Sequence, residues 1–128
     1  MSSLRRTLEG DVLVHHLKRD EQMIDRDLLA RHGRTARTLV KEGPLRLTVI
    51  ALAAGGSIPS HHAEGPVTIH LLEGEVVFDV AEQPYPLASG DVLVLASGVP
   101  HSAHSSAGCV LLLTVVHFPS AGSRVSET

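Results

Sequence analysis

Aromatic side chains are scarce in this chain of 128 residues. It contains no Trp, one Tyr and two Phe, so aromatic residues make up 2% of the sequence, whereas apolar residues make up 43%. The core must therefore be built from Val, Leu, Ile and Ala, and the apolar fraction predicts a folded rather than a disordered chain. Because bases stack on flat aromatic side chains, this scarcity argues against binding of single-stranded nucleic acid.

Long basic runs, long apolar runs and a second cysteine are also missing. The formal net charge is −3, and the densest group of cations, Arg31, Arg34 and Arg37, is too small to bind a nucleic-acid duplex or an anionic membrane. No apolar stretch approaches the roughly 18 residues of a membrane span, and residues 1–10 lack the apolar segment of a secretion signal. The single cysteine, Cys109, lies in an apolar run and is expected in the core. We therefore expect a cytoplasmic protein that contacts neither nucleic acid nor membranes.

The hydrophobic periodicity predicts one helix near the N-terminus. Apolar residues share one face over residues 20–31, Asp20 is a candidate cap at the start, and Gly33 can end the helix. The chain length suits a single core. We expect three segments: an N-terminal segment (1–42) with a helix at about 20–32 and the first strand, a barrel (43–118), and a disordered tail (119–128).

From Arg34 onward the pattern is that of short strands. Apolar and polar residues alternate, and turns rich in Gly and Pro separate the alternating stretches. Gly74 is expected to be one of these turns, between strands at 67–73 and 76–80. Strands at this spacing predict an all-β sandwich or barrel.

Two stretches of the chain resemble the two sequence motifs of the cupin family. Residues 55–74 (GGSIPSHHAEGPVTIHLLEG) resemble the first motif, and residues 90–101 (GDVLVLASGVPH) resemble the second, with Gly90, Gly98 and His101 in register. The resemblance implies an all-β cupin double-stranded β-helix, which is a jelly-roll-like barrel, here with one short N-terminal helix. It also implies an internal pocket with a divalent metal, bound by two His and one Glu of the first motif and one His of the second.

Only part of that ligand set is present in this chain. Five residues separate Gly55 from His61, which takes the first His position, and the second motif supplies His101. The second His position is occupied by Ala63 and the Glu position by Val67. Two of the four ligands that the resemblance implies are therefore missing.

Three nearby residues are candidates to complete the set. On regular strands His62 and His70 face away from the expected site, so each needs a bulge to turn inward. Glu64 lies in an expected turn that can bring its carboxylate to the site. With a third ligand the site would hold one divalent transition metal (Zn, Ni, Fe or Mn). Without one, the histidines would make hydrogen bonds in a metal-free pocket. Both interpretations stay open.

The expected pocket is mostly apolar with two imidazoles. Its lining is predicted to include His61, Val67, Ile69, His101 and Ala103, and imidazole suits a small anionic or carbonyl-bearing ligand. Two function classes follow. The first is a binding module for a small molecule. The second is a metal-dependent cupin enzyme (a dioxygenase, isomerase or decarboxylase) that acts on a small organic compound.

Two further expectations concern the ends of the chain. Cupins commonly form dimers, so the resemblance implies a homodimer, and we expect residues up to about Lys41 to cross to the partner. His117, at the end of the last strand, is expected to satisfy a local polar group rather than to touch a ligand.

Overall fold

One short helix and eight strands make up the described part of the chain. The computed structural model describes residues 11–17 and 23–117, so the predicted tail and the predicted cap at Asp20 lie outside the described residues. The elements are α1 (Arg26–His32), β1 (Arg34–Glu42), β2 (Leu45–Leu52), β3 (Ser57–His61), β4 (Val67–Val80), β5 (Gln83–Ala88), β6 (Val92–Leu95), β7 (His101–His104) and β8 (Cys109–Val116). No helix in the described residues is long and apolar enough to cross a membrane.

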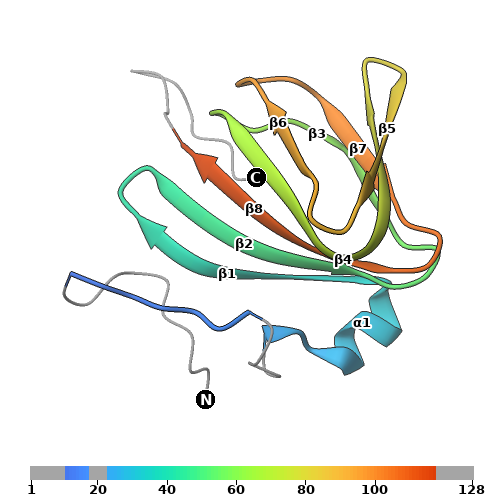
Figure 1. Cartoon of the computed structure of the whole chain (residues 1–128), viewed down its shortest axis with the longest axis horizontal. Coiled ribbons are helices and arrows are strands. Elements are labelled where there is room, and N and C mark those ends of the chain that lie inside the picture. The colour runs from blue at the N-terminus through green and yellow to red at the C-terminus, as the bar shows by residue number, and fades with distance from the viewer. Residues whose placement is uncertain (1–10, 18–22, 118–128) are drawn as a thin grey trace.

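The strands form one antiparallel sheet that curls over on itself (Figure 1). The strand order is β1-β2-β8-β4-β7-β3, and β5 and β6 also pair with β4. β4 therefore has four partners and lies where the curled sheet turns back. The predicted all-β barrel with one short helix is confirmed.

Gly74 is a bend inside β4, so the predicted turn at this residue is wrong. The first half of β4 pairs with β6 and β8, and the second half pairs with β5 and β7. Gly74 has φ 86°, and a Cβ added there would lie 2.1 Å from the carbonyl oxygen of Gly108. Only glycine allows both the positive φ and this close approach. The strand thus changes partners without being interrupted.

Helix α1 is shorter than the predicted helix at about 20–32. Asp25 is its N-cap, and the carboxylate of Asp25 accepts a hydrogen bond of 3.0 Å from the backbone N–H of Leu28. Met23 therefore lies before the helix rather than on its apolar face. The predicted end is confirmed, because Gly33 is the C-cap with φ 79°.

Apolar side chains pack on both faces of the sheet. The inner core lies in the hollow of the curled sheet, and its largest fully buried members are Phe78, Leu52, Ile69, Leu71 and Leu111. The outer core lies on the other face of β1, β2 and β8 and includes Met23, Leu39, Val40, Val49, Ala51 and Val110. Residues 11–17 and α1 contribute Leu13, Leu17 and Leu29 to the outer core, and Figure 1 shows these segments alongside β1. The N-terminal segment thus packs on its own chain.

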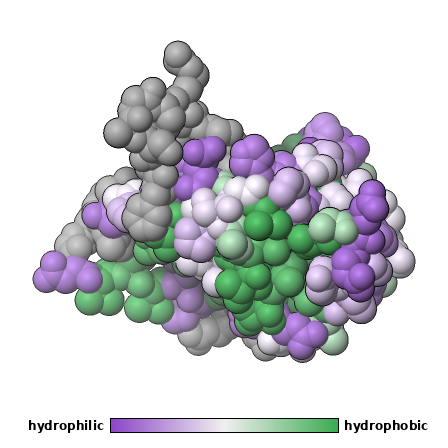
Figure 2. All heavy atoms as spheres, turned by 90° about the horizontal axis from the view of Figure 1, so that it is seen from above, coloured by the Kyte–Doolittle hydropathy of each residue, from purple (hydrophilic) through white to green (hydrophobic). Residues whose placement is uncertain are grey.

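Some apolar side chains remain on the surface. Figure 2 shows one face on which they gather into a patch bordered by polar side chains. The exposed large apolar residues include Val92 and Val94 on β6 and Val12 and Val14 near the N-terminus. Contiguous apolar surface is typical of contacts between proteins, and the homodimer stays a prediction.

Candidate functional site

A cavity lies between the inner face of the β1-β2-β8 region and strands β3 and β7. Its volume is about 310 Å³, which is at the lower end of the range for small-molecule pockets. Its wall is formed by Ala36, Thr38, Lys41, Arg46, Thr48, Ile50, His61, Ala63, Val67, His101, Leu113, Val115 and His117. The curl of the sheet thus brings residues as far apart in sequence as Ala36 and His117 around one small cavity.

The two predicted histidines meet in this cavity. His61 ends β3, His101 begins β7, and the two are cross-strand partners in the antiparallel ladder. Their ring centroids are 4.4 Å apart and the ring planes are tilted by 56°. The ring of Phe78 lies 6.2 Å from that of His101, on the side of the inner core.

Backbone contacts fix which nitrogen of each ring is available. Nδ1 of His101 lies 3.0 Å from the carbonyl oxygen of Val99, and Nδ1 of His61 lies 3.1 Å from that of Pro59. A carbonyl oxygen only accepts hydrogen bonds, so Nδ1 is the donor in each pair. In the neutral ring Nε2 is then left as an acceptor.

Burial keeps His101 in the neutral form. Its side chain is almost fully enclosed, and this burial lowers its pKa because the charged ring loses contact with water. Nearby His61 and His62 lower the pKa of His101 further through charge repulsion, whereas the carbonyl of Val99 opposes the shift. Nε2 of His101 is therefore an acceptor at neutral pH.

The residues of the cavity do not fit the metal centre that the resemblance implies. Ala63 and Val67 line the cavity, and they occupy the positions of the missing His and Glu. Among residues 11–17 and 23–117, no group of three or more His, Cys, Asp or Glu side chains is placed to hold a metal ion. Catalytic metal sites usually have three protein ligands. The His61–His101 pair supplies two imidazole nitrogens, the third wall histidine, His117, is not grouped with them as a metal site, and no carboxylate of the described residues lines the cavity.

The candidate third ligands lie elsewhere. The side chain of His62 is 51% exposed, and its Nε2 lies 3.9 Å from the carboxylate of Glu64. Neither residue lines the cavity. His70 is paired in regular register with Leu112, a residue of the outer core. Without a bulge at His70, strand alternation leaves its side chain on the outer face.

Only one of the three predicted apolar wall residues lines the cavity. Val67 does, whereas Ile69 and Ala103 are packed in the inner core. Ala103 is the cross-strand partner of Ile58 and of Phe78. The interior of a small barrel is largely filled by side chains. A residue can therefore face inward, as strand alternation predicts, and still be packed among core side chains instead of lining the cavity.

His117 was missed as a cavity residue. It is 8% exposed, it lines the cavity, and its Nε2 is buried without a hydrogen-bond partner among the described residues. The prediction that it satisfies a local polar group is therefore wrong. Its backbone N–H donates to the carbonyl of Pro44, which fixes the end of β8. Strand alternation from Leu113 and Val115 was the signal that could have placed it on the inner wall.

Two cations complete the cavity wall. Lys41 and Arg46 are cross-strand partners in the β1-β2 hairpin. The guanidinium of Arg46 donates to the carbonyls of Gly43 at 2.5 Å and Leu45 at 3.2 Å. In the described residues no Asp or Glu lines this cavity, and this leaves it with an excess of positive charge.

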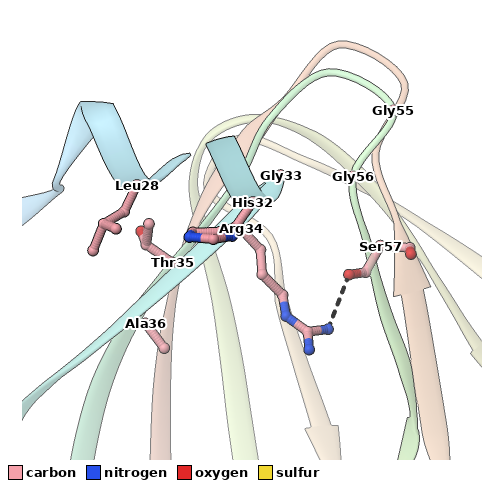
Figure 3. A pocket seen from close by; sticks show the side chains of 9 residues that line it. All are labelled: Leu28, His32, Gly33, Arg34, Thr35, Ala36, Gly55, Gly56 and Ser57. Atoms are coloured by element: carbon pink, nitrogen blue, oxygen red, sulfur yellow. Dashed lines mark hydrogen bonds between the residues drawn. The ribbon is translucent and has the colours of Figure 1, made fainter. Parts of the chain in front are cut away.

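A second hollow lies beside α1 (Figure 3). It has a volume of about 570 Å³ and is lined by residues 28 and 32–36 and by residues 55–57. Its Arg34 guanidinium donates a hydrogen bond of 3.2 Å to the carbonyl of Ser57. Figure 3 shows that the other side chains around it are short or lie on the helix. The His61–His101 cavity is smaller and less open, and it brings together five basic side chains, so we take it as the candidate site.

Two residues that follow the second motif have structural roles. The hydroxyl of Ser105 donates to the backbone carbonyl of Glu75 at 2.5 Å. The same hydroxyl accepts a hydrogen bond of 2.9 Å from the N–H of Gly108. Cys109 is buried, and burial raises the pKa of its thiol. The prediction that Cys109 is a core residue is confirmed.

The chain is similar to known cupins in sequence and in structure. A family model described as a cupin domain matches residues 48–116. A search of curated proteins found no match. A conserved protein of unknown function from Streptococcus pyogenes is 25% identical with a TM-score of 0.65, covering 94% of this chain and 98% of that one.

Two further solved structures share the fold at lower identity. A cupin superfamily protein from Desulfitobacterium hafniense is 16% identical with a TM-score of 0.65, covering 91% of this chain and 100% of that one. Salicylate 1,2-dioxygenase from Pseudoaminobacter salicylatoxidans, solved with gentisate, is 22% identical with a TM-score of 0.63. That match covers 66% of this chain and 25% of the dioxygenase. At these identities the likeness concerns the fold alone.

Proposed function

Because the chain belongs to the cupin family, we propose that it binds a small organic molecule in the cavity between the His61–His101 pair and the curled sheet. The observation that carries this proposal is the pair itself. Both rings line a cavity of about 310 Å³, and each Nδ1 is held by a backbone carbonyl. Nε2 is then the polar atom of each ring that is free to contact a ligand.

The rest of the wall determines how this contact works. Apart from the basic side chains and Thr38 and Thr48, the lining residues are apolar. A hydrogen bond to imidazole in such surroundings is stronger than in water, because solvent competes less for the same atoms. A ligand with a hydroxyl or N–H donor would be held at Nε2 and would cover the apolar wall with its carbon skeleton.

The second candidate function is a metal-dependent enzyme. One observation favours it, since histidines that bind metals commonly donate their other nitrogen to a carbonyl, as both histidines do here. The donor set argues against it, because no third His, Cys, Asp or Glu side chain of the described residues is placed to bind a metal together with His61 and His101. We therefore place binding ahead of metal-dependent catalysis.

The test compares the two proposals on one protein preparation. A fragment library of small alcohols, amides, acids and amines is screened by amide NMR, and bound metal is measured on the same sample. We expect some compounds to shift the signals around residues 61 and 101, and we expect well under one equivalent of metal. The variant His101→Phe keeps a ring but loses the nitrogens, and it should weaken binding about tenfold.

The matched control is His70→Phe, the same change on the outer face of β4, which should leave binding intact. If about one equivalent of metal is present and is lost in His101→Ala, the enzyme class replaces the binding class. If no compound in the library shifts these signals, the binding proposal is rejected.

A further inference from the structure

The cavity has a second polar end, formed by Lys41, Arg46 and His117. Lys41 and Arg46 are partners across the β1-β2 hairpin. Arg46 is also the partner of Val115 on β8, and His117 follows two residues later, so His117 is a diagonal neighbour of Arg46. All three line the cavity.

This end is separate from the histidine pair. His61 shares a neighbouring hollow with Ala36 and Ile50, and Ile50 lies four residues along β2 from Arg46. Four residues of antiparallel strand span about 13 Å. Between the two ends the wall contains the apolar residues Val67 and Leu113 and the hydroxyl-bearing pair Thr38 and Thr48. The cavity therefore has basic side chains at both ends and an uncharged middle.

The chemistry of the second end favours a negatively charged group. Lys41 and Arg46 bring two positive charges, and no acidic side chain of the described residues lines the cavity to balance them. His117 adds a ring nitrogen that is buried and has no hydrogen-bond partner in the part of the chain that the structure describes. Buried polar atoms are almost always paired, so the unpaired Nε2 indicates a place where a ligand atom belongs.

We infer that this end takes a carboxylate, and that the ligand is a small organic acid with a hydroxyl or N–H group at its other end. The inference rests on the proposed function, since it names the class of molecule for the same cavity. The carboxylate accepts from the Arg46 guanidinium, the Lys41 ammonium and Nε2–H of His117. The hydroxyl or N–H donates to the acceptor nitrogens of His61 and His101.

Three probes separate the two ends of the ligand. They are 3-(4-hydroxyphenyl)propanoate, its methyl ester, which lacks the charge, and 3-phenylpropanoate, which lacks the hydroxyl. Hydrogen bonds to charged groups contribute more than neutral ones. By calorimetry we expect the ester to bind about tenfold or more weakly, and the acid without the hydroxyl to bind a few-fold more weakly.

Variants test the residues of this end. His117→Phe keeps the ring and removes both nitrogens, so the acid should bind about tenfold more weakly while the ester is unaffected. Its midpoint of thermal unfolding should stay the same or rise, because an unpaired buried polar atom is removed. A purely structural His117 would instead lower the midpoint. Lys41→Met should weaken acid binding about two- to fivefold, whereas the control Arg31→Met, which removes one exposed charge on α1, should not.

The outcomes distinguish the organic-acid inference from the proposed function on which it rests. If no compound shifts the signals of the cavity, the proposed function itself is rejected. If library compounds bind beside His61 and His101 but the acids do not bind, or bind no better than their esters, only the organic-acid inference is overturned. Unchanged acid affinity in both His117→Phe and Lys41→Met would overturn it as well.

Discussion

The two faces of the β1-β2-β8 region differ in how the chain closes them. On the outer face Leu39, Val49 and Val110 are covered by residues 11–17, Met23 and α1, so the space is filled by the same chain. On the inner face the same strands present Thr48, Leu113 and Val115 to a cavity that the chain leaves open. A sheet face that is completed by its own chain contributes stability, whereas a face with an open, basic hollow is where a ligand can bind.

The largest loss of stability is expected when a buried leucine is replaced by alanine, once on each face of the sheet. Leu111→Ala in the inner core and Leu39→Ala in the outer core both truncate a side chain with 0% exposure. Such changes cost about 2–5 kcal/mol, and the loss depends on how well the surroundings collapse into the space. We expect Leu111→Ala near the upper end of this range, because strands surround it on all sides, and Leu39→Ala near the lower end. Urea unfolding measures the free energy of unfolding of both variants. A larger loss in Leu39→Ala than in Leu111→Ala would contradict the comparison.

A smaller loss of stability is expected from removing the hydrogen bonds of Ser105, here called the Ser105 clip, which hold the loop after β7. Ser105 is 1% exposed, and its hydroxyl joins the carbonyl of Glu75 to the N–H of Gly108. Ser105→Ala leaves both groups without this partner and should reduce the free energy of unfolding by about 1–3 kcal/mol. The neighbouring Ser106→Ala, at an exposed position, is the control and should change it by less than about 0.5 kcal/mol. Equal losses in the two variants would show that the clip contributes little.

The smallest expected effect is a pH dependence of stability that is caused by His101 on the inner face of the sheet. The folded protein lowers the pKa of His101, mainly through burial, so the unfolded chain binds a proton there more readily. As pH falls through the ordinary histidine pKa of about 6.5, the unfolded state gains protons first and stability decreases. His101→Phe should flatten this dependence between pH 7.5 and 5.5, measured as urea midpoints. The outer-face variant His70→Phe serves as the reference, and an equal flattening there would mean that the dependence has another source.

The strand pattern and the two motifs predicted the barrel and the meeting of His61 with His101. The prediction succeeded because tight glycine corners and period-two alternation are local properties of the chain. The turn predicted at Gly74 failed for a non-local reason, since that residue is a bend made necessary by the backbone of Gly108 on another segment. Helix α1 begins later than predicted, and its observed N-cap is Asp25, a second aspartate that the sequence also offers.

The site was only partly visible in the sequence. The sequence showed that Ala63 and Val67 occupy two of the implied ligand positions. These two residues already indicated that the implied metal site is incomplete. His117 was not predicted to line the cavity, because its position beside Arg46 depends on the pairing of β2 with β8, two segments some 70 residues apart in sequence. Glu64 and His62 were candidates by position, but in space they pair with each other.

The sequence by itself determined the all-β class and the corners of the barrel, because both depend on residue type and short-range spacing, and the resemblance of its two motifs to those of cupins implied that His61 and His101 meet. Tertiary structure alone decided which side chains surround the open space: it excluded Ile69, Ala103 and His70 and added Lys41, Arg46 and His117. The physical reason is that strand alternation says which face a side chain lies on, whereas the curl of the sheet decides whether that face meets packed core or a cavity.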